Sequence, residues 1–237
     1  MNIRGLQPFT MVDFPGKLAC VVFVGNCNFR CGYCHNPVLV FDPESQPQIS
    51  EEFFFDFLEK RKGKLDGVVI SGGEPSLRSA LDDFIREVKS RGFAVKLDTN
   101  GSNAERVKRI WNEHGIDAFG IDYKAPASKY PHISNCNDEN IAGKVQNMIK
   151  FAVDNHVPTD VRTTVHRSLL SPEDLKEMRR ELYALGQKRW VLQQFHPVDI
   201  IDDDLLYEPT YSDRELLDLA REIGNDTHVR GLKGILI

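Results

Sequence analysis

Six short runs of apolar and β-branched residues alternate with longer amphipathic runs along this chain of 237 residues. We predict strands at residues 18–24, 67–71, 94–98, 118–122, 160–165 and 190–195. We predict the intervening helices at 76–91, 103–114, about 140–155 and 172–185. Short strands separated by such helices indicate βαβ units, a parallel sheet and right-handed crossovers. Six units are fewer than the eight of a closed barrel, so the pattern fits an open doubly wound sheet or a partial barrel.

Turn and cap residues support these boundaries. Ser171 followed by Pro172 is a typical helix start, and four glycines stand where a helix end needs a left-handed residue: Gly63, Gly92, Gly115 and Gly186. The acidic segment 199–209 is expected to be a surface loop, followed by a helix at 212–223 and a short strand near 234–237. We therefore expect a single domain over 1–237, with a core at about 18–197 and a C-terminal extension at 198–237.

Charge and composition exclude several classes of protein. The formal net charge is −5 with a pI of about 5.8, so the basic excess of a nucleic-acid-binding protein is missing. The first residues lack the apolar core of a signal peptide, and no apolar stretch is long enough for a membrane span. We expect a cytoplasmic protein. Five cysteines in a reducing compartment favour metal binding or catalysis over disulfides.

Three of the cysteines fall within eight residues, directly after the first predicted strand. Cys27, Cys31 and Cys34 have the spacing C-x3-C-x2-C. Thiolates suit iron–sulfur clusters or zinc, and three of them can hold three corners of a cubane cluster. The fourth corner then has no obvious protein ligand, and an open coordination position is typical of a catalytic site.

Plainer roles for the cysteines are a zinc site or unliganded thiols. Structural zinc needs a fourth Cys or His at a second paired spacing, and His35 is poorly placed beside Cys34. Cys20 lies inside an apolar strand and is expected to be a core residue. Cys136 lies in a polar loop and is given no role.

Further polar motifs follow the predicted strands. Residues 71–75 read Ser-Gly-Gly-Glu-Pro, in which glycines permit close backbone approach and Glu74 can accept a hydrogen bond from an ammonium group. Residues 98–101 read Asp-Thr-Asn-Gly, and Asp122 and Lys124 share a strand face. Each has a plain structural interpretation as a helix start, a turn or a surface ion pair. Because all of them follow strands of one sheet, they are also expected at one ligand-binding edge.

The triad, with Tyr33 before its last cysteine, resembles the radical S-adenosylmethionine (SAM) superfamily. Residues 34–37, Cys-His-Asn-Pro, are similar to the activases of glycyl radical enzymes. Residues 5–24 are similar to one branch of the activating proteins of anaerobic ribonucleoside-triphosphate reductase. The resemblance extends from Gly5 to about His196, and it implies a partial (β/α)6 barrel.

The same resemblance implies the cofactors and the site. It implies a [4Fe–4S] cluster held by Cys27, Cys31 and Cys34, with SAM on the open iron. The residues expected to contact SAM are Tyr33, Asn36, Gly72, Gly73, Glu74, Asp98, Asn100, Asp122, Lys124, Arg162 and His196. His35 is expected only to orient the loop.

The implied reaction is reductive cleavage of SAM to a 5′-deoxyadenosyl radical, which then abstracts hydrogen from a glycine of a partner glycyl radical enzyme. The partner implied is a class III ribonucleotide reductase, and the implied electron donor is flavodoxin or ferredoxin. Two alternatives remain open. One is a radical SAM enzyme acting on a small molecule, as deazapurine carboxylate synthases do, although these usually lack Cys-His-Asn. The other is a non-enzymatic iron–sulfur electron carrier, which would normally have a fourth cysteine.

Overall fold

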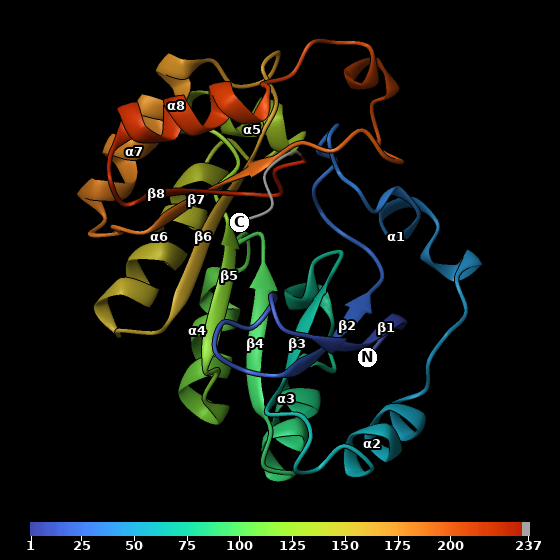
Figure 1. The fold of residues 1–237 in the computed structure, drawn as a ribbon. Coiled ribbons are helices and arrows are strands. Elements are labelled where there is room, and N and C mark those ends of the chain that lie inside the picture. The colour runs from blue at the N-terminus through green and yellow to red at the C-terminus, as the bar shows by residue number, and fades with distance from the viewer. Residues whose placement is uncertain (234–237) are drawn as a thin grey trace. The chain divides into compact units, whose positions relative to one another are not determined.

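The computed structural model describes residues 1–233 as an α/β fold that divides into two compact units (Figure 1). The first comprises Met1–Asn28 with Asn36–Gly120, and the second comprises Phe29–His35 with Ile121–Ile237. The eight strands follow chain order in the sheet, and β5 (Ala118–Asp122) passes from the first unit into the second. Each unit is described by itself below.

The first unit is built on parallel strands with one antiparallel edge strand. In this unit β2 pairs in parallel with β3, which pairs in parallel with β4, and β1 is antiparallel to β2. The strands are β1 (Ile3–Thr10), β2 (Ala19–Val24), β3 (Gly67–Gly72) and β4 (Ala94–Thr99). The α-helices are α1 (Pro37–Phe41), α2 (Glu51–Glu59), α3 (Leu81–Ser90) and α4 (Ala104–His114). Two 3-10 turns, η1 (Pro43–Ser45) and η2 (Pro75–Leu77), complete the unit.

The second unit has parallel strands throughout its pairs. Here β6 pairs with β7, and β7 pairs with β8. The strands are β6 (Thr159–Val165), β7 (Trp190–Gln194) and β8 (Thr227–Arg230). The α-helices are α5 (Tyr130–Ser134), α6 (Ile141–Asp154), α7 (Pro172–Ala184) and α8 (Asp213–Ile223), with 3-10 turns η3 (Ala127–Lys129) and η4 (Asp203–Leu206).

The six predicted strands are confirmed as β2 to β7, with end shifts of one residue. They form because their apolar runs are buried on both faces, as in β3, where Val68, Val69 and Ile70 are fully buried. In α3, residues Leu81, Phe84, Ile85 and Val88 repeat at helical spacing and are all buried. The strand predicted near 234–237 lies outside the described residues.

One predicted boundary is wrong, and several elements were not predicted. The helix expected from residue 76 starts only at Leu81, because the chain forms the η2 turn and is extended at Arg78, with ψ 119°. The unpredicted elements are β1, α1, α5, β8 and the 3-10 turns, and α2 was anticipated only through the helix end expected at Gly63. Ser171 forms a capping box with Asp174, and Gly92, Gly115 and Gly186 follow their helices with positive φ as predicted. Gly63 also has a positive φ, but α2 ends at Glu59 with Lys60 as its C-cap, so Gly63 does not cap this helix. None of the described helices is long and apolar enough to span a membrane.

Candidate functional site

The three clustered cysteines are free thiols on a loop that both units share. Cys27 belongs to the first unit, whereas Cys31 and Cys34 belong to the second. Cys31 is buried, and Cys27 and Cys34 are partly exposed. Within residues 1–233, no three His, Cys, Asp or Glu side chains converge closely enough to hold a single metal ion. A cluster does not require such convergence, because each thiolate binds a different iron atom.

The turn after β4 contacts the first cysteine. The side-chain amide Nδ2 of Asn100 lies 3.8 Å from Cys27 Sγ and 3.0 Å from Asn28 Oδ1. The amide oxygen of Asn100 accepts a hydrogen bond from Ser102 N at 2.9 Å, which fixes the side chain's orientation. The SAM contact expected of Asn100 stays a prediction, and the sequence gives no signal for its contact with Cys27.

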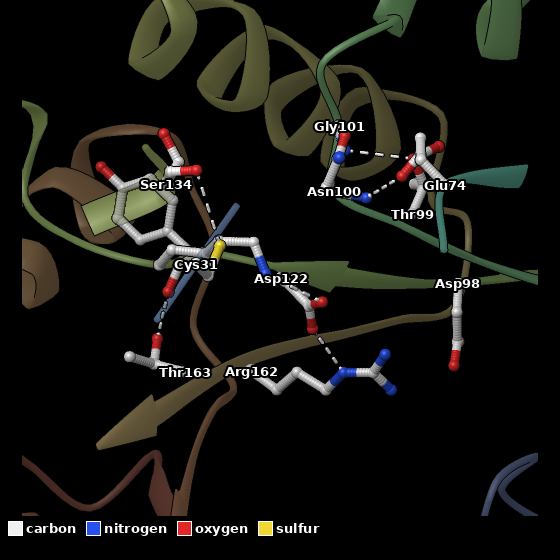
Figure 2. A network of polar contacts seen from close by, with 12 residues as sticks. Cys31, Glu74, Asp98, Thr99, Asn100, Gly101, Asp122, Ser134, Arg162 and Thr163 are labelled. Carbon is white, nitrogen blue, oxygen red and sulfur yellow. Dashed lines mark hydrogen bonds and ion pairs between the residues drawn. The ribbon is translucent and has the colours of Figure 1, made fainter. Parts of the chain in front are cut away.

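Glu74 is fully buried and bonded to its own chain. Its carboxylate accepts hydrogen bonds from Ser76 N at 3.0 Å, Thr99 Oγ1 at 2.7 Å and Asn100 N at 2.7 Å, and Figure 2 shows Glu74 beside Thr99 and Asn100. Burial raises the pKa of this carboxyl, and the hydrogen bonds oppose that rise. Glu74 thus joins the Gly-Gly-Glu-Pro segment to the turn after β4. Its expected contact with a ligand ammonium group stays a prediction.

The two glycines before Glu74 are required by the packing of the chain itself. A Cβ atom on Gly72, where φ is +112°, would lie 2.4 Å from Val24 N, and one on Gly73 would lie 2.1 Å from Asn26 O. Glu74 N donates to that same Asn26 oxygen at 2.8 Å. The close backbone approach expected at these two glycines therefore exists. It is made to the backbone of Val24 and Asn26, which precede Cys27.

Asp98 is buried beside a lysine that the motif analysis missed. Lys96, only 1% exposed, donates to Asp98 Oδ1, and Ser71 Oγ donates to Asp98 Oδ2 at 3.2 Å. Gly120 leaves room for this pair, since a Cβ there would lie 2.2 Å from Asp98 Oδ1 and 2.9 Å from Lys96 Nζ. The available sequence signal was a lysine two residues before Asp98 in an apolar strand, because that spacing places both on one face.

In the second unit, α5 holds the segment around Cys31. Ser134 O accepts a hydrogen bond from Arg30 N at 2.9 Å, and Cys31 Sγ lies 3.9 Å from the same oxygen (Figure 2). Burial raises the pKa of the Cys31 thiol, and the nearby Lys124 ammonium opposes the rise. Lys124 is thus the cation best placed to stabilise a thiolate at Cys31 within this unit.

Lys124 also belongs to a charged group at the end of β5. Asp122 accepts hydrogen bonds from Arg162 Nε at 2.6 Å and Lys124 Nζ at 3.3 Å (Figure 2 shows the Arg162 contact). Burial alone would raise the pKa of Asp122, but the two cations outweigh it and hold the pKa well below its usual value. Lys124 Nζ lies 5.9 Å from the centre of the Tyr33 ring, which is 6% exposed. Four predicted site residues therefore meet here.

His35 and His196 both lie near Phe195, just after β7. The ring of His35 lies 5.8 Å from that of Phe195. Burial lowers the pKa of His35, and the nearby His196 lowers it further. A Cβ on Gly231 would lie 3.0 Å from His196 Nε2. Gly231 directly follows β8, so the end of this strand lies close to His196.

Three further residues were singled out by the sequence: Asn36, Cys20 and Cys136. Asn36, in the first unit, is the N-cap of α1, but its side chain makes no capping hydrogen bond. Cys20 is fully buried in β2, and burial raises its pKa to about 12, which confirms it as a core residue. Cys136 is partly exposed, and its N–H donates to Pro131 O at 3.1 Å.

Comparison with known proteins gives a family match over most of the chain. The model of the radical SAM superfamily matches residues 21–186. A Methanocaldococcus jannaschii protein named as a glycyl-radical enzyme activating enzyme is 31% identical, over 92% of this chain and 90% of that protein. The pyruvate formate-lyase-activating enzyme of Staphylococcus epidermidis is 27% identical, over 78% of this chain and 74% of that enzyme.

A solved structure supports the fold. Streptococcus suis SuiB bound to the precursor peptide SuiA matches with a TM-score of 0.70 at 13% identity, over 89% of this chain. This chain covers 48% of that one, so it spans about half the length of the solved structure. Together with the family match, this confirms the predicted fold class, an α/β fold with the partial barrel core of radical SAM enzymes.

Proposed function

Since this chain belongs to the radical SAM superfamily, and within it to the glycyl-radical enzyme activating enzymes, we propose that it activates an anaerobic, class III ribonucleotide reductase. Its cofactors are a [4Fe–4S] cluster and SAM. The substrate is then a glycine of the partner protein. The electron donor proposed is a flavodoxin or a ferredoxin.

Cys27, Cys31 and Cys34 are proposed to hold the cluster. Their donor chemistry fits, because all three are free thiols and thiolates are the usual ligands of iron–sulfur clusters. When bound, the reduced cluster and SAM supply one-electron chemistry that generates a 5′-deoxyadenosyl radical able to take a hydrogen atom from glycine. The chain's task is to bind, orient and shield these groups.

The side chains around each cysteine are suited to that task. In the first unit, Asn100 directs an N–H toward Cys27, and such hydrogen bonds to sulfur tune a cluster's reduction potential. In the second unit, Asp122 remains ionised beside Lys124 and Arg162, which offers charged partners to the carboxylate and amino groups of SAM. The proposed SAM contacts are Tyr33, Asn36, Gly72, Gly73, Glu74, Asp98, Asn100, Asp122, Lys124, Arg162 and His196.

One observation carries the proposal: Asn100 contacts Cys27 directly. This joins a motif expected to line the SAM pocket to a cysteine expected to hold the cluster. The choice of reductase as partner is supported by the resemblance of residues 5–24 to the reductase activating proteins, whereas Cys34-His35-Asn36-Pro37 supports the wider class of glycyl-radical-enzyme activases.

The test uses purified protein reconstituted with iron and sulfide without oxygen. It is mixed with SAM, a reductant and either a class III ribonucleotide reductase or pyruvate formate-lyase, and the glycyl radical is measured by electron paramagnetic resonance. We expect the radical on the reductase. A radical on pyruvate formate-lyase alone would contradict the partner, and SAM cleavage dependent on a small molecule instead would contradict the activase reaction.

A further inference from the structure

A C-terminal segment packs against the loop that carries Cys31 and Cys34. Residues 200–206, called the strap below, belong to the second unit, as does the cysteine loop. Asp202 N donates a hydrogen bond to Gly32 O at 2.9 Å. We propose that the strap is a positioning element that holds Cys31 and Cys34 in the arrangement needed for ligation.

Gly32 permits this contact. A Cβ atom at Gly32 would lie 2.9 Å from Cβ of Asp202 and 3.5 Å from Cδ1 of Leu205. The first distance is shorter than carbon atoms tolerate, so any larger residue at position 32 would push the strap away from the loop. The strap therefore requires a residue without a side chain at position 32.

His166 binds the C-terminal part of the strap, at Leu205. This side chain is fully buried, and its Nε2 lies 3.2 Å from Leu205 O. Ser168 N donates to Nδ1 of the same ring at 3.3 Å, so Nδ1 is the acceptor and Nε2 carries the proton given to Leu205. Burial lowers the pKa of His166, which keeps the ring in this neutral form. The ring also packs edge-on against Phe195 at 4.8 Å.

Apolar contacts add to these hydrogen bonds. Ile200 and Leu205 are 6% and 5% exposed, whereas Asp203 between them is exposed. The Asp202 side chain accepts a hydrogen bond from Asp204 N at 3.2 Å, which starts the η4 turn. The strap therefore has one apolar face turned inward and an acidic face turned to solvent.

The loop is consequently held from two directions within the second unit. Before Cys31, Ser134 O accepts a hydrogen bond from Arg30 N; after Cys31, Gly32 O accepts one from Asp202 N of the strap. A segment with so few backbone contacts opens locally when one fastening is removed, without unfolding of the core. The inference thus assigns a role to residues 200–206 of the C-terminal extension.

The test measures thiol accessibility in the reduced, metal-free protein. Gly32→Ala displaces the strap by a steric clash, and His166→Ala removes the hydrogen bond to Leu205 O. Asp203→Ala, on the exposed face of the strap, is the matched control. Iodoacetamide labelling is followed for each cysteine by peptide mass spectrometry. Because one hydrogen bond is worth about 1 kcal/mol, Cys31 and Cys34 should label roughly fivefold faster in the first two variants. Cys20, in the core, and the control protein should keep the wild-type rate.

A second readout rests on the proposed function. After anaerobic reconstitution, a chelator should bleach the cluster roughly fivefold faster in the same two variants than in the control. Unchanged labelling rates of Cys31 and Cys34 in the two variants would overturn the role proposed for the strap. An equal increase in the labelling rate of Cys20 would also overturn it, because that would report loss of the whole fold. If wild-type protein took up no cluster, the proposed function would fail, while the labelling result would still decide the strap.

Discussion

Nδ2 of Asn100 lies 3.8 Å from Sγ of Cys27, within a turn whose backbone is fixed by the carboxylate of Glu74. A donor directed at a thiolate stabilises its negative charge, and still more so after the cluster has gained an electron. The buried carboxylate of Glu74 therefore anchors Asn100, and Asn100 in turn contacts Cys27 in the cysteine loop.

Replacing Asn100 by Leu should slow SAM cleavage with little change in fold. Removing an outer partner of a metal ligand usually lowers metal affinity or activity by about 10- to 100-fold. The measurement is the rate of 5′-deoxyadenosine formation, together with the cluster's reduction potential, which should fall. Asn112→Leu, at an exposed site on α4, is the matched control. An unchanged rate and potential in the Asn100 variant would contradict the role given to this contact.

Replacing Glu74 by Gln should destabilise the protein and change its pH dependence. The amide nitrogen of Gln would face a backbone N–H where a carboxylate oxygen now accepts a hydrogen bond. A buried N–H that is left without its acceptor costs about 1–3 kcal/mol. Because the pKa of Glu74 is raised by burial, the folded protein holds a proton longer than the unfolded chain does. Stability should therefore fall as pH rises above 4.5, the ordinary value for this group, and the variant should lack that fall.

Denaturant unfolding at several pH values measures this effect. Glu52→Gln, on the exposed face of α2, serves as control and should leave both the stability and its slope unchanged. Equal slopes in wild type and the Glu74 variant would mean that Glu74 does not titrate in this range.

Replacing Lys96 by Met should remove the buried cation that pairs with Asp98. Breaking a buried pair from one side typically costs about 3–5 kcal/mol, whereas exposed pairs contribute about 0–1 kcal/mol. Lys62→Met, which breaks an exposed pair with Glu59, is therefore the control. Thermal unfolding compares the two variants, and a similar small loss in both would refute the burial argument. The double variant Lys96→Met, Asp98→Asn should recover part of the lost stability.

Replacing Cys31 by Ala should abolish cluster assembly and leave a folded chain. Cys20→Ala removes a thiol of similar burial from β2 and should cost about 1 kcal/mol of stability while keeping the cluster. Iron and sulfide content after anaerobic reconstitution, with circular dichroism as the check on folding, compares the two. A full cluster in the Cys31 variant would exclude this residue as a ligand.

The sequence predicts the buried strands well because their apolar, β-branched runs leave few alternatives. It does not predict β1, whose residues include Gly5 and Pro8 and lack a clear alternation. It anticipates α2 only as a helix ending near Gly63, without bounds, because three consecutive phenylalanines obscure the helical period, although Ser50 caps the helix. The early helix start at residue 76 fails because the Glu74 side chain caps a 3-10 turn there instead.

The candidate site is predicted in its motifs but not in their contacts. Gly72 and Gly73 suggest room for a ligand, yet the structure shows that backbone from β2 to Asn26 occupies the space beside them. Lys96 and His166 carry no motif, and their roles depend on partners at Asp98 and Leu205. The spacing of Lys96 and Asp98 places both on one strand face, but only tertiary packing buries this pair and brings His166 to Leu205.

The most direct test of the activase reaction follows hydrogen from the partner to the product. The reconstituted protein is incubated with SAM, a reductant and a class III ribonucleotide reductase prepared with α-deuterated glycine, and the 5′-deoxyadenosine formed is analysed by mass spectrometry. The account predicts that deuterium appears in 5′-deoxyadenosine together with a glycyl radical on the reductase. Unlabelled 5′-deoxyadenosine and no such radical would contradict it.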